Sequence, residues 1–246
     1  ANDGEYELWK YDGATPTKIN VAAIGSSYPD QLTDVNGTLY FSARDGQHGV
    51  YTQLFRCADT TVTTIPLVDG ATRADPLYLT NVNGTLYTWV HYSLDGANYS
   101  WGLYRVDGTT ATRIAVNPGT NWSPTSGMVG SGTTLYFPLY EGEHLERLTL
   151  WKCDGASTTR IDVDPSGSPS PNSLTDVNGT LYFSAYDGAD RELWKYDGAT
   201  LTKINVNPAG SSYPVALTNV NGTLFFSTRW TGPGDDLWQY DGSTLS

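Results

Sequence analysis

The sequence predicts an all-β fold, a five-bladed β-propeller built of four-stranded antiparallel blades. Three observations predict it. The composition favours strands and turns, because 26 Gly, 17 Tyr and 8 Trp stand beside only 16% charged residues. A repeat with the length of a propeller blade runs through the chain. Asn-Gly and Asp-Gly dipeptides separate short runs of β-forming residues at regular intervals.

The repeat can be followed by eye. Residues 32–43 read LTDVNGTLYFSA, and residues 174–185 read the same letters. Residues 7–20 and 192–205 differ at one position. The Leu of the GTLYF block recurs at positions 39, 86, 135, 181 and 224, so the spacings are 47, 49, 46 and 43. Units of this length with several short strands each are typical of propeller blades.

Each unit contains four expected strands in chain order. In the first full unit, strand one covers residues 32–35 and strand two covers residues 38–43. The Asn36-Gly37 pair between them suits a type I′ hairpin turn, which needs two residues at positive φ. Strand three is the ELWKY block, first seen at 7–11, and an Asp-Gly turn leads from it into strand four at 17–20.

The two ends of the chain determine the expected number of blades. The sequence opens with strands three and four (7–21) and reaches strands one, two and three of a last unit (217–240). Together with four complete units, this predicts five blades in a single domain of residues 1–246. We expect the ring to close by pairing of the N-terminal strand four with the C-terminal blade. Six blades, with both partial units completed by another subunit, is the alternative.

Three blocks of the sequence resemble a known repeat. ELWKYDGAT at 7–15, ELWKYDGAT at 192–200 and DLWQYDGST at 236–244 look like the ELWxxDGT repeat found in β-propeller and surface proteins. The resemblance covers essentially the whole chain, although residues 48–160 are more diverged. It implies a propeller in an extracellular setting, secreted or at the cell surface, and no catalytic residue. The expected architecture is also similar to that of five-bladed lectins of the tachylectin type, whose sequence motifs are absent here.

Charge and motifs exclude several classes of protein. The chain carries 14 Lys and Arg against 26 Asp and Glu, a formal charge of −12, and has no basic run that would suit nucleic acid or an anionic membrane. No apolar stretch approaches the ~20 residues of a membrane-spanning helix. Metal-ligand spacings and nucleophile motifs are absent from the sequence. We therefore expect no enzyme, no cofactor, no metal, no nucleic-acid partner and no membrane insertion.

Most repeated residues have a structural explanation. The aromatic residue of strand three is expected between blades, as at Trp9, Trp151 and Trp194. Asp34 and Asp176 precede their hairpins and are expected to cap them, as Asn does in two other units; a catalytic carboxylate pair is the alternative. Cys57 and Cys153 share one repeat position two blades apart, so both are expected to be buried and reduced.

The candidate binding residues are those that break the repeat. The loops between strands two and three and between strands four and one are expected at one end of the ring, and they contain exposed aromatic residues beside ionic and hydroxyl side chains. The SSYP motif occurs twice there, at 26–29 and 211–214. The predicted ligand-binding residues are Tyr28, Arg44, Asp45, Trp101, Trp122, Asp187, Arg191, Tyr213 and Trp230.

This set of residues suggests a function. Aromatic rings beside small hydrogen-bonding groups suit a sugar, and repeated sites facing one way would add avidity. The sequence therefore predicts a lectin-like, carbohydrate-binding propeller without enzymatic activity, whose partners are glycans or glycoconjugates. A structural or adhesive scaffold that binds protein or a small ligand is the alternative, and a glycoside hydrolase is the third interpretation.

Overall fold

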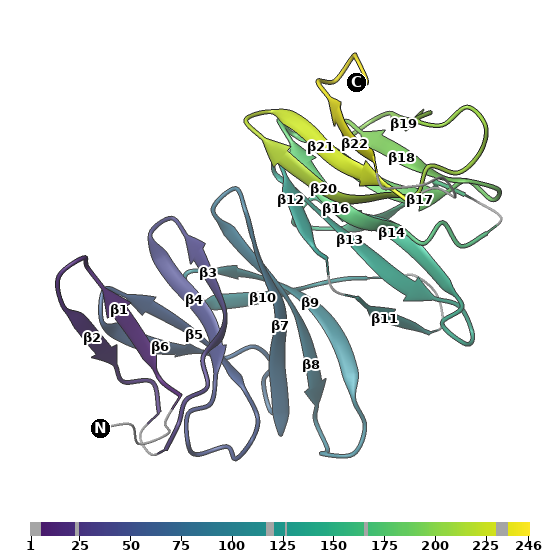
Figure 1. Cartoon of the computed structure of the whole chain (residues 1–246). Coiled ribbons are helices and arrows are strands. Elements are labelled where there is room, and N and C mark those ends of the chain that lie inside the picture. The colour runs from purple at the N-terminus through teal and green to yellow at the C-terminus, as the bar shows by residue number, and fades with distance from the viewer. Residues whose placement is uncertain (1–5, 23–24, 117–120, 126, 165–166, 230–235) are drawn as a thin grey trace. The chain divides into compact units, whose positions relative to one another are not determined.

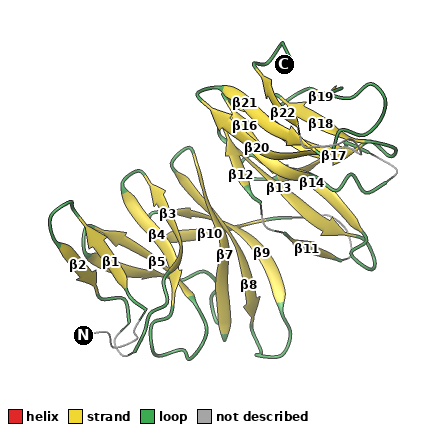
Figure 2. Cartoon of the chain, in the orientation of Figure 1, coloured by secondary structure: helices red, strands yellow, loops and turns green. Residues whose placement is uncertain are grey.

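The computed structural model describes residues 6–22, 25–116, 121–125, 127–164, 167–229 and 236–246. All regular structure in these residues is β-strand (Figure 2). This part of the chain contains no helix long and apolar enough to cross a membrane. The chain divides into two compact units, Ala1–Val116 and Asn117–Ser246, and each is described by itself below.

The first unit contains three antiparallel sheets (Figure 1). The first has two strands, β1 (Leu8–Tyr11) and β2 (Pro16–Ile19). The second has four: β3 (Asp30–Val35), β4 (Thr38–Ala43), β5 (Gln53–Ala58) and β6 (Thr61–Ile65). The third contains β7 (Arg73–Val82), β8 (Thr85–Ser93), β9 (Ser100–Asp107) and β10 (Thr110–Ile114).

The second unit also contains three antiparallel sheets. In the first, β11 (Trp122–Pro124) and β12 (Val129–Ser131) both pair with β13 (Thr134–Glu141), followed by β14 (Arg147–Cys153) and β15 (Thr158–Ile161). The next contains β16 (Asn172–Val177), β17 (Thr180–Tyr186), β18 (Arg191–Tyr196) and β19 (Leu201–Ile204). The last contains β20 (Pro214–Val220), β21 (Thr223–Thr228) and β22 (Asp236–Tyr240).

The hairpin between strands one and two forms as the Asn-Gly turn predicts. Asn36 and Gly37 have φ of 52° and 78°, the left-handed region that these two residue types tolerate. The flanking Val35 and Thr38 are register partners. Strand one is longer than expected, because β3 begins at Asp30 and includes a bulge before Thr33. Equivalent bulges interrupt β7, β16 and β20.

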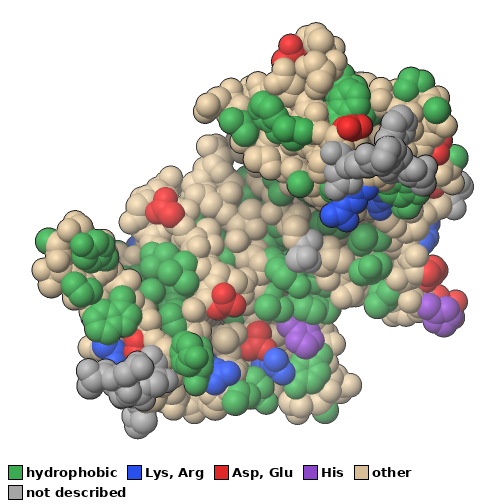
Figure 3. All heavy atoms as spheres, in the orientation of Figure 1, with side chains coloured by type: hydrophobic (Ala, Val, Ile, Leu, Met, Phe, Trp, Pro, Cys, Tyr) green, Lys and Arg blue, Asp and Glu red, His purple; other side chains and the backbone are tan. Residues whose placement is uncertain are grey.

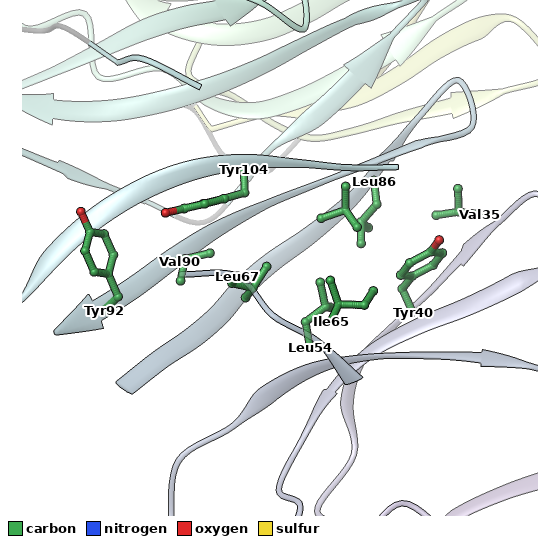
Figure 4. Close-up of a cluster of buried hydrophobic side chains, with 10 residues drawn as sticks. Val35, Tyr40, Leu54, Ile65, Leu67, Leu86, Val90, Tyr92 and Tyr104 are labelled. Carbon is green, nitrogen blue, oxygen red and sulfur yellow. The ribbon is translucent and has the colours of Figure 1, made fainter. Parts of the chain in front are cut away.

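The core lies between successive sheets. Leu54 and Tyr40 of one sheet pack with Leu86, Val90 and Tyr104 of the next sheet in one buried cluster. Figure 4 shows these side chains pointing toward one another from the two sheets. Each four-stranded sheet therefore contributes both of its faces to burial, which explains why apolar residues occur at successive positions of β4 and β5.

The coarse fold prediction is confirmed, but closure of the ring is not. The described residues form six antiparallel sheets and no helix, and three of these sheets have four strands. Strand β2, expected to pair with the C-terminal blade, pairs with β1. The edge of β22 instead bonds to Ser246, whose N–H and C=O both pair with Gln239. Five blades and a single domain stay predictions.

The residues suspected of catalysis cap turns instead. Asp34 Oδ1 accepts a hydrogen bond from Gly37 N at 3.0 Å, and Asp176 Oδ1 accepts one from Gly179 N at 3.1 Å. Asn81 and Asn219 do the same in their own units. Since Asp and Asn make one contact at one repeat position, turn capping explains these residues.

Two further expectations can be compared with the structure. Cys57 and Cys153 are both buried and free. Trp151 and Trp194 are buried between sheets, as predicted, whereas Trp9 at the same position of β1 is exposed. Trp9 differs because no sheet covers that face of β1 and β2 within the described part of the first unit.

Candidate functional site

The SSYP motif ties its loop to the preceding sheet. In the first unit, Ser26 Oγ accepts a hydrogen bond from Tyr6 N at 3.1 Å. The N–H groups of Ser27 and Tyr28 both donate to Tyr6 O at 3.1 Å. Ser27 Oγ donates to a carboxylate oxygen of Glu7 at 3.0 Å. Both serines therefore have a structural role, because they hydrogen-bond to the backbone of Tyr6 and the side chain of Glu7, about twenty residues earlier in the chain.

The same arrangement recurs in the second unit. Ser211 Oγ accepts from Arg191 N at 3.0 Å, and the N–H groups of Ser212 and Tyr213 donate to Arg191 O. Ser212 Oγ donates to Glu192 Oε2 at 2.6 Å. Burial raises the pKa of Glu192, and the Ser212 hydrogen bond partly offsets this effect. In both copies the tyrosine is held at positive φ, 46° for Tyr28 and 47° for Tyr213, with its ring partly exposed.

In the first unit, the loop brings three side chains of the rim together. The rings of Tyr6 and Tyr28 are stacked with centroids 5.1 Å apart. The guanidinium carbon of Arg44, just beyond the end of β4, lies 4.5 Å from the centroid of Tyr28. The predicted pair Tyr28 and Arg44 is therefore one cluster, and Tyr6 is a member that the sequence interpretation missed. Its place directly before the first ELW block, where Arg191 stands in the other copy, is the signal that could have revealed it.

This cluster forms one wall of a cavity of about 500 Å³. The other walls come from the start of β3 and the middle of β7, and the cavity therefore opens where the long loops leave the sheets. Gln31 bridges the two sheets, since its amide donates to Pro76 O at 3.3 Å and accepts from Leu79 N at 3.2 Å. The lining residues are Tyr6, Glu7, Tyr28, Pro29, Asp30, Gln31, Ser42, Arg44, Thr52, Pro76 and Leu77.

Arg44 is the only cation among the described residues of this lining, and it is unpaired. Among the described residues no side-chain hydrogen bond or ion pair reaches it, and its Nε is buried without a partner. The two acids nearby have other contacts: Glu7 binds Lys18 and Ser27, and Asp30 accepts from Gln31 N. Arg44 contacts the Tyr28 ring but has no hydrogen-bond partner for its buried Nε, which is unusual because a buried unpaired donor costs about 1–3 kcal/mol.

Arg191 shows the opposite situation in the second unit. Its guanidinium donates to Ser184 O, Ser184 Oγ and Ser170 O and lies 4.4 Å from the centroid of Tyr186. Tyr186 in turn contacts Tyr213 edge to face, at 6.5 Å between centroids. The predicted residues Arg191 and Tyr213 are therefore brought together, but the guanidinium of Arg191 binds groups of the protein itself.

The two predicted carboxylates also bind within their own loops. Partial burial by itself would raise the pKa of Asp45, but the N–H groups of Gln47 and His48 and the ring of His48 lower it to about 2. Lys203, 2.6 Å from Asp187 Oδ2, is the main cause that lowers the pKa of Asp187 to about 2. Neither carboxylate lines the cavity at Arg44.

The predicted tryptophans are dispersed. Trp101 lies in β9, not in a loop, and its ring is 4.5 Å from that of His91 on the paired strand β8. His91 also stacks on Tyr99, whose ring contacts Arg73. Trp122 lies in β11, paired with Glu141. Trp230 falls outside the described residues.

A third copy of the anchored loop escaped the sequence analysis. In SPSP, residues 168–171, Ser168 Oγ accepts from Leu148 N and Ser170 N donates to Leu148 O. These are the bonds that SSYP makes to Tyr6 and Arg191. Ser170 replaces the tyrosine at φ 46°, so this copy has the anchor without the ring. Within the described part of the chain, no group of three His, Cys, Asp or Glu side chains could hold a metal ion.

Comparisons with known proteins identify the fold. No family model and no curated protein matches the chain. Among solved structures, the β-propeller domain of the trilobed protease from Pyrococcus furiosus matches 94% of this chain and 69% of its own, at 10% identity and a TM-score of 0.56. The acylaminoacyl peptidase of Pyrococcus horikoshii matches at 8% identity and a TM-score of 0.55, and a prolyl endopeptidase at 14% and 0.55. Both matches include 95% of this chain, but they span only 39% and 37% of the length of the two enzymes.

These neighbours overturn the carbohydrate-binding prediction. The three solved structures named above are those of peptidases, and none of them is a lectin. The structure also supplies a physical reason. The polar groups that were expected to bind a sugar have partners inside the protein. They are the serine hydroxyls of SSYP, the carboxylates of Asp45 and Asp187 and the guanidinium of Arg191. At these identities the comparisons establish one thing about the chain, its β-propeller fold.

Proposed function

We propose that this chain is a non-catalytic propeller module that binds a carboxylate-bearing ligand in the Arg44 cavity. The observation that carries the proposal is the unpaired guanidinium of Arg44 in the wall of a cavity of about 500 Å³. A carboxylate would be a suitable partner for this guanidinium, because Arg binds carboxylates through two parallel hydrogen bonds.

The rest of the lining indicates what the carboxylate is attached to. Tyr6 and Tyr28 offer a stacked pair of partly exposed rings, and Pro29, Pro76 and Leu77 add apolar surface. Such a lining suits a flat or apolar group next to the acid. The C-terminal residue of a peptide and a small aromatic acid share this chemistry.

The test compares ligands that differ in one group. The peptide Gly-Gly-Phe with a free C-terminus, its amidated form and phenylacetate are each titrated into the chain by calorimetry. We expect the free peptide to bind at least tenfold more tightly than the amidated one, since Arg44 loses its partner in the amide. Binding of phenylacetate as tight as that of the free peptide would identify a small acid as the ligand class.

Arg44→Gln supplies the variant arm. It should abolish the preference for the free acid, whereas Arg229→Gln, at the same repeat position in the second unit, should preserve it. Equal binding of free and amidated peptides by the unmodified chain, or no binding of any of the three probes at millimolar concentration, would refute the proposal.

Three finer expectations remain part of this proposal. The near-equal spacing of the repeat markers supports five blades. The ELW blocks support membership of the ELWxxDGT repeat proteins and, through it, a secreted or surface location. A crystal structure of the chain would count the blades directly, and detection of the intact protein on unpermeabilised cells would test the location.

A further inference from the structure

A second, smaller cavity lies next to the Arg44 cavity in the first unit. Its volume is about 170 Å³. Thr52 lines both cavities. Strand β7 also contributes to both, since it lines the smaller cavity at residues 73–74 and the Arg44 cavity at residues 76–77. The two cavities are therefore neighbours along one strand of the same unit.

Asp75 lies at the boundary between the two cavities. Its Oδ1 accepts hydrogen bonds from Thr52 N at 3.0 Å and from Thr52 Oγ1 at 3.3 Å. Arg73 Nε donates to the other carboxylate oxygen. The carboxylate is buried and has a partner for each oxygen, so it holds the boundary in place and is not available to a ligand.

The floor of the smaller cavity is apolar. It is formed by Leu54 and Ile65, which are paired residues of β5 and β6, and by Leu67, and all three are buried. Figure 4 shows these side chains close together. An apolar cavity of about 150 Å³ can hold a benzene molecule, so the volume and lining of this cavity suit one apolar side chain.

The charged groups of the smaller cavity already have partners. His48 Nδ1 lies 2.5 Å from Asp45 Oδ2, and Arg73 is paired with Asp75. Figure 3 shows hydrophobic side chains beside basic and acidic ones along the loop end of this unit. In the larger cavity, by contrast, the buried Nε of Arg44 has no hydrogen-bond partner. The larger cavity therefore suits a charged group and the smaller one an uncharged group, because burying a charge without a partner is costly.

We propose that the smaller cavity binds an apolar side chain of a peptide whose C-terminal carboxylate binds Arg44. This inference rests on the proposed function and narrows its ligand class to a peptide with a free C-terminus. Ala74 and Leu77 of β7 are three residues apart, which is about 10 Å at ~3.3 Å per residue. An extended peptide covers that distance in three residues, and a long side chain can bridge part of it. The apolar side chain therefore belongs to the residue two or three places before the C-terminal one.

Tetrapeptides with a free C-terminus test the position and the chemistry. Gly-Gly-Gly-Phe, Leu-Gly-Gly-Phe and Gly-Leu-Gly-Phe, each also in its amidated form, are titrated into the native chain by calorimetry. We expect at least one leucine peptide to bind about fivefold or more tightly than Gly-Gly-Gly-Phe, because burial of the leucine adds to binding. Glutamate in place of that leucine should remove the gain.

Ala71→Leu provides the variant test. Ala71 lines the smaller cavity but not the larger one, and it is partly exposed on the loop before β7. The added side chain should fill the cavity and remove the leucine gain, while the preference for free acids over amides remains. Ala209→Leu is the matched control, because Ala209 stands five residues before Pro214 as Ala71 does before Pro76, and it is exposed. It should change neither property, and thermal unfolding checks that both variants are folded.

The outcomes separate this inference from the proposed function. A preference of the native chain for free acids without a leucine gain would overturn the inference alone, whether or not Ala71→Leu folds. A leucine gain that persists in folded Ala71→Leu, or an equal gain from glutamate, would also overturn it. No preference of the native chain for free acids would refute the proposed function and this inference with it.

Discussion

At the scale of single residues, the rim loops show how one short motif combines two roles. The serines of SSYP hold the loop to the previous sheet, while the tyrosine is presented outward at positive φ. The replacement of Tyr by Ser170 in the third copy shows that the anchor does not need the ring. The aromatic ring is therefore the part of the motif that is free to serve binding.

The buried carboxylate of this anchor predicts a pH effect. Burial raises the pKa of Glu192, so the folded chain holds that proton more tightly than the unfolded chain. The contribution of this group to stability is complete below 4.5, the ordinary pKa of a glutamate, and is lost as the pH rises through the raised folded value. Glu192→Gln stays neutral at both pH values. The stability of this variant relative to the native chain, measured by urea unfolding, should therefore be higher at pH 7 than at pH 4.

Asp187→Asn is the matched control, because the pKa of Asp187 is shifted in the opposite direction to that of Glu192. The pKa of Asp187 is lowered to about 2, so its contribution is present above 3.8, the ordinary pKa of an aspartate, and is lost only as the pH falls through about 2. This substitution should cost the same at pH 4 and pH 7, about 1 kcal/mol or less for a partly exposed ion pair. If Glu192→Gln also showed no change between these pH values, burial would not govern the titration of Glu192.

At the scale of elements, the Asn-Gly hairpins join neighbouring sheets as well as strands. Asn178 Nδ2 donates to Gly222 O of the next hairpin, and Asn219 Nδ2 donates back to Asp176 O. In the first unit, Asn36 and Asn81 make the equivalent bonds. The Asn of each Asn-Gly turn thus links neighbouring sheets through its side chain, while its backbone takes the left-handed conformation.

Two substitutions at one turn separate these roles. Asn178→Gly removes the amide but tolerates the φ of 53°, whereas Asn178→Ala removes the amide and strains the backbone. We expect the alanine variant to be less stable than the glycine variant by about 1 kcal/mol, the usual cost of a left-handed residue with a Cβ. Thermal unfolding of both variants measures the difference, and equal melting temperatures would show that the turn relaxes freely.

The elements were also the most predictable feature of this chain. The strand expected at 38–43 is β4, residue for residue, because a short run of β-forming residues and the Asn-Gly turn before it both act locally. The roles of Ser27 and Arg191 could not be read from the sequence, since the partners Glu7 and Ser170 lie about twenty residues earlier in the chain. The Arg44 cluster was partly predicted, because exposed aromatic residues in long loops are visible in sequence, but the lack of a partner for Arg44 is a property of three-dimensional packing.

At the scale of the whole molecule, stability depends on how many neighbours each sheet has. Repeat proteins gain stability from contacts between adjacent units, so a sheet covered on one face only contributes less. In the first unit, β3 to β6 meets neighbours through both faces, in the clusters around Phe41 and Leu54. The sheet of β1 and β2 has two strands and one covered face, and a two-stranded sheet is marginal in water by itself.

Hydrogen exchange should therefore follow a gradient along the chain. In a dilute sample, the amides of β1 and β2 should exchange fastest among the strands, and those of β4 and β5 should be among the slowest, because opening β1 and β2 breaks the fewest contacts. Mass spectrometry of exchanged peptides measures both. Equal protection of all these strands in the dilute sample would show that having one covered face costs the sheet of β1 and β2 nothing.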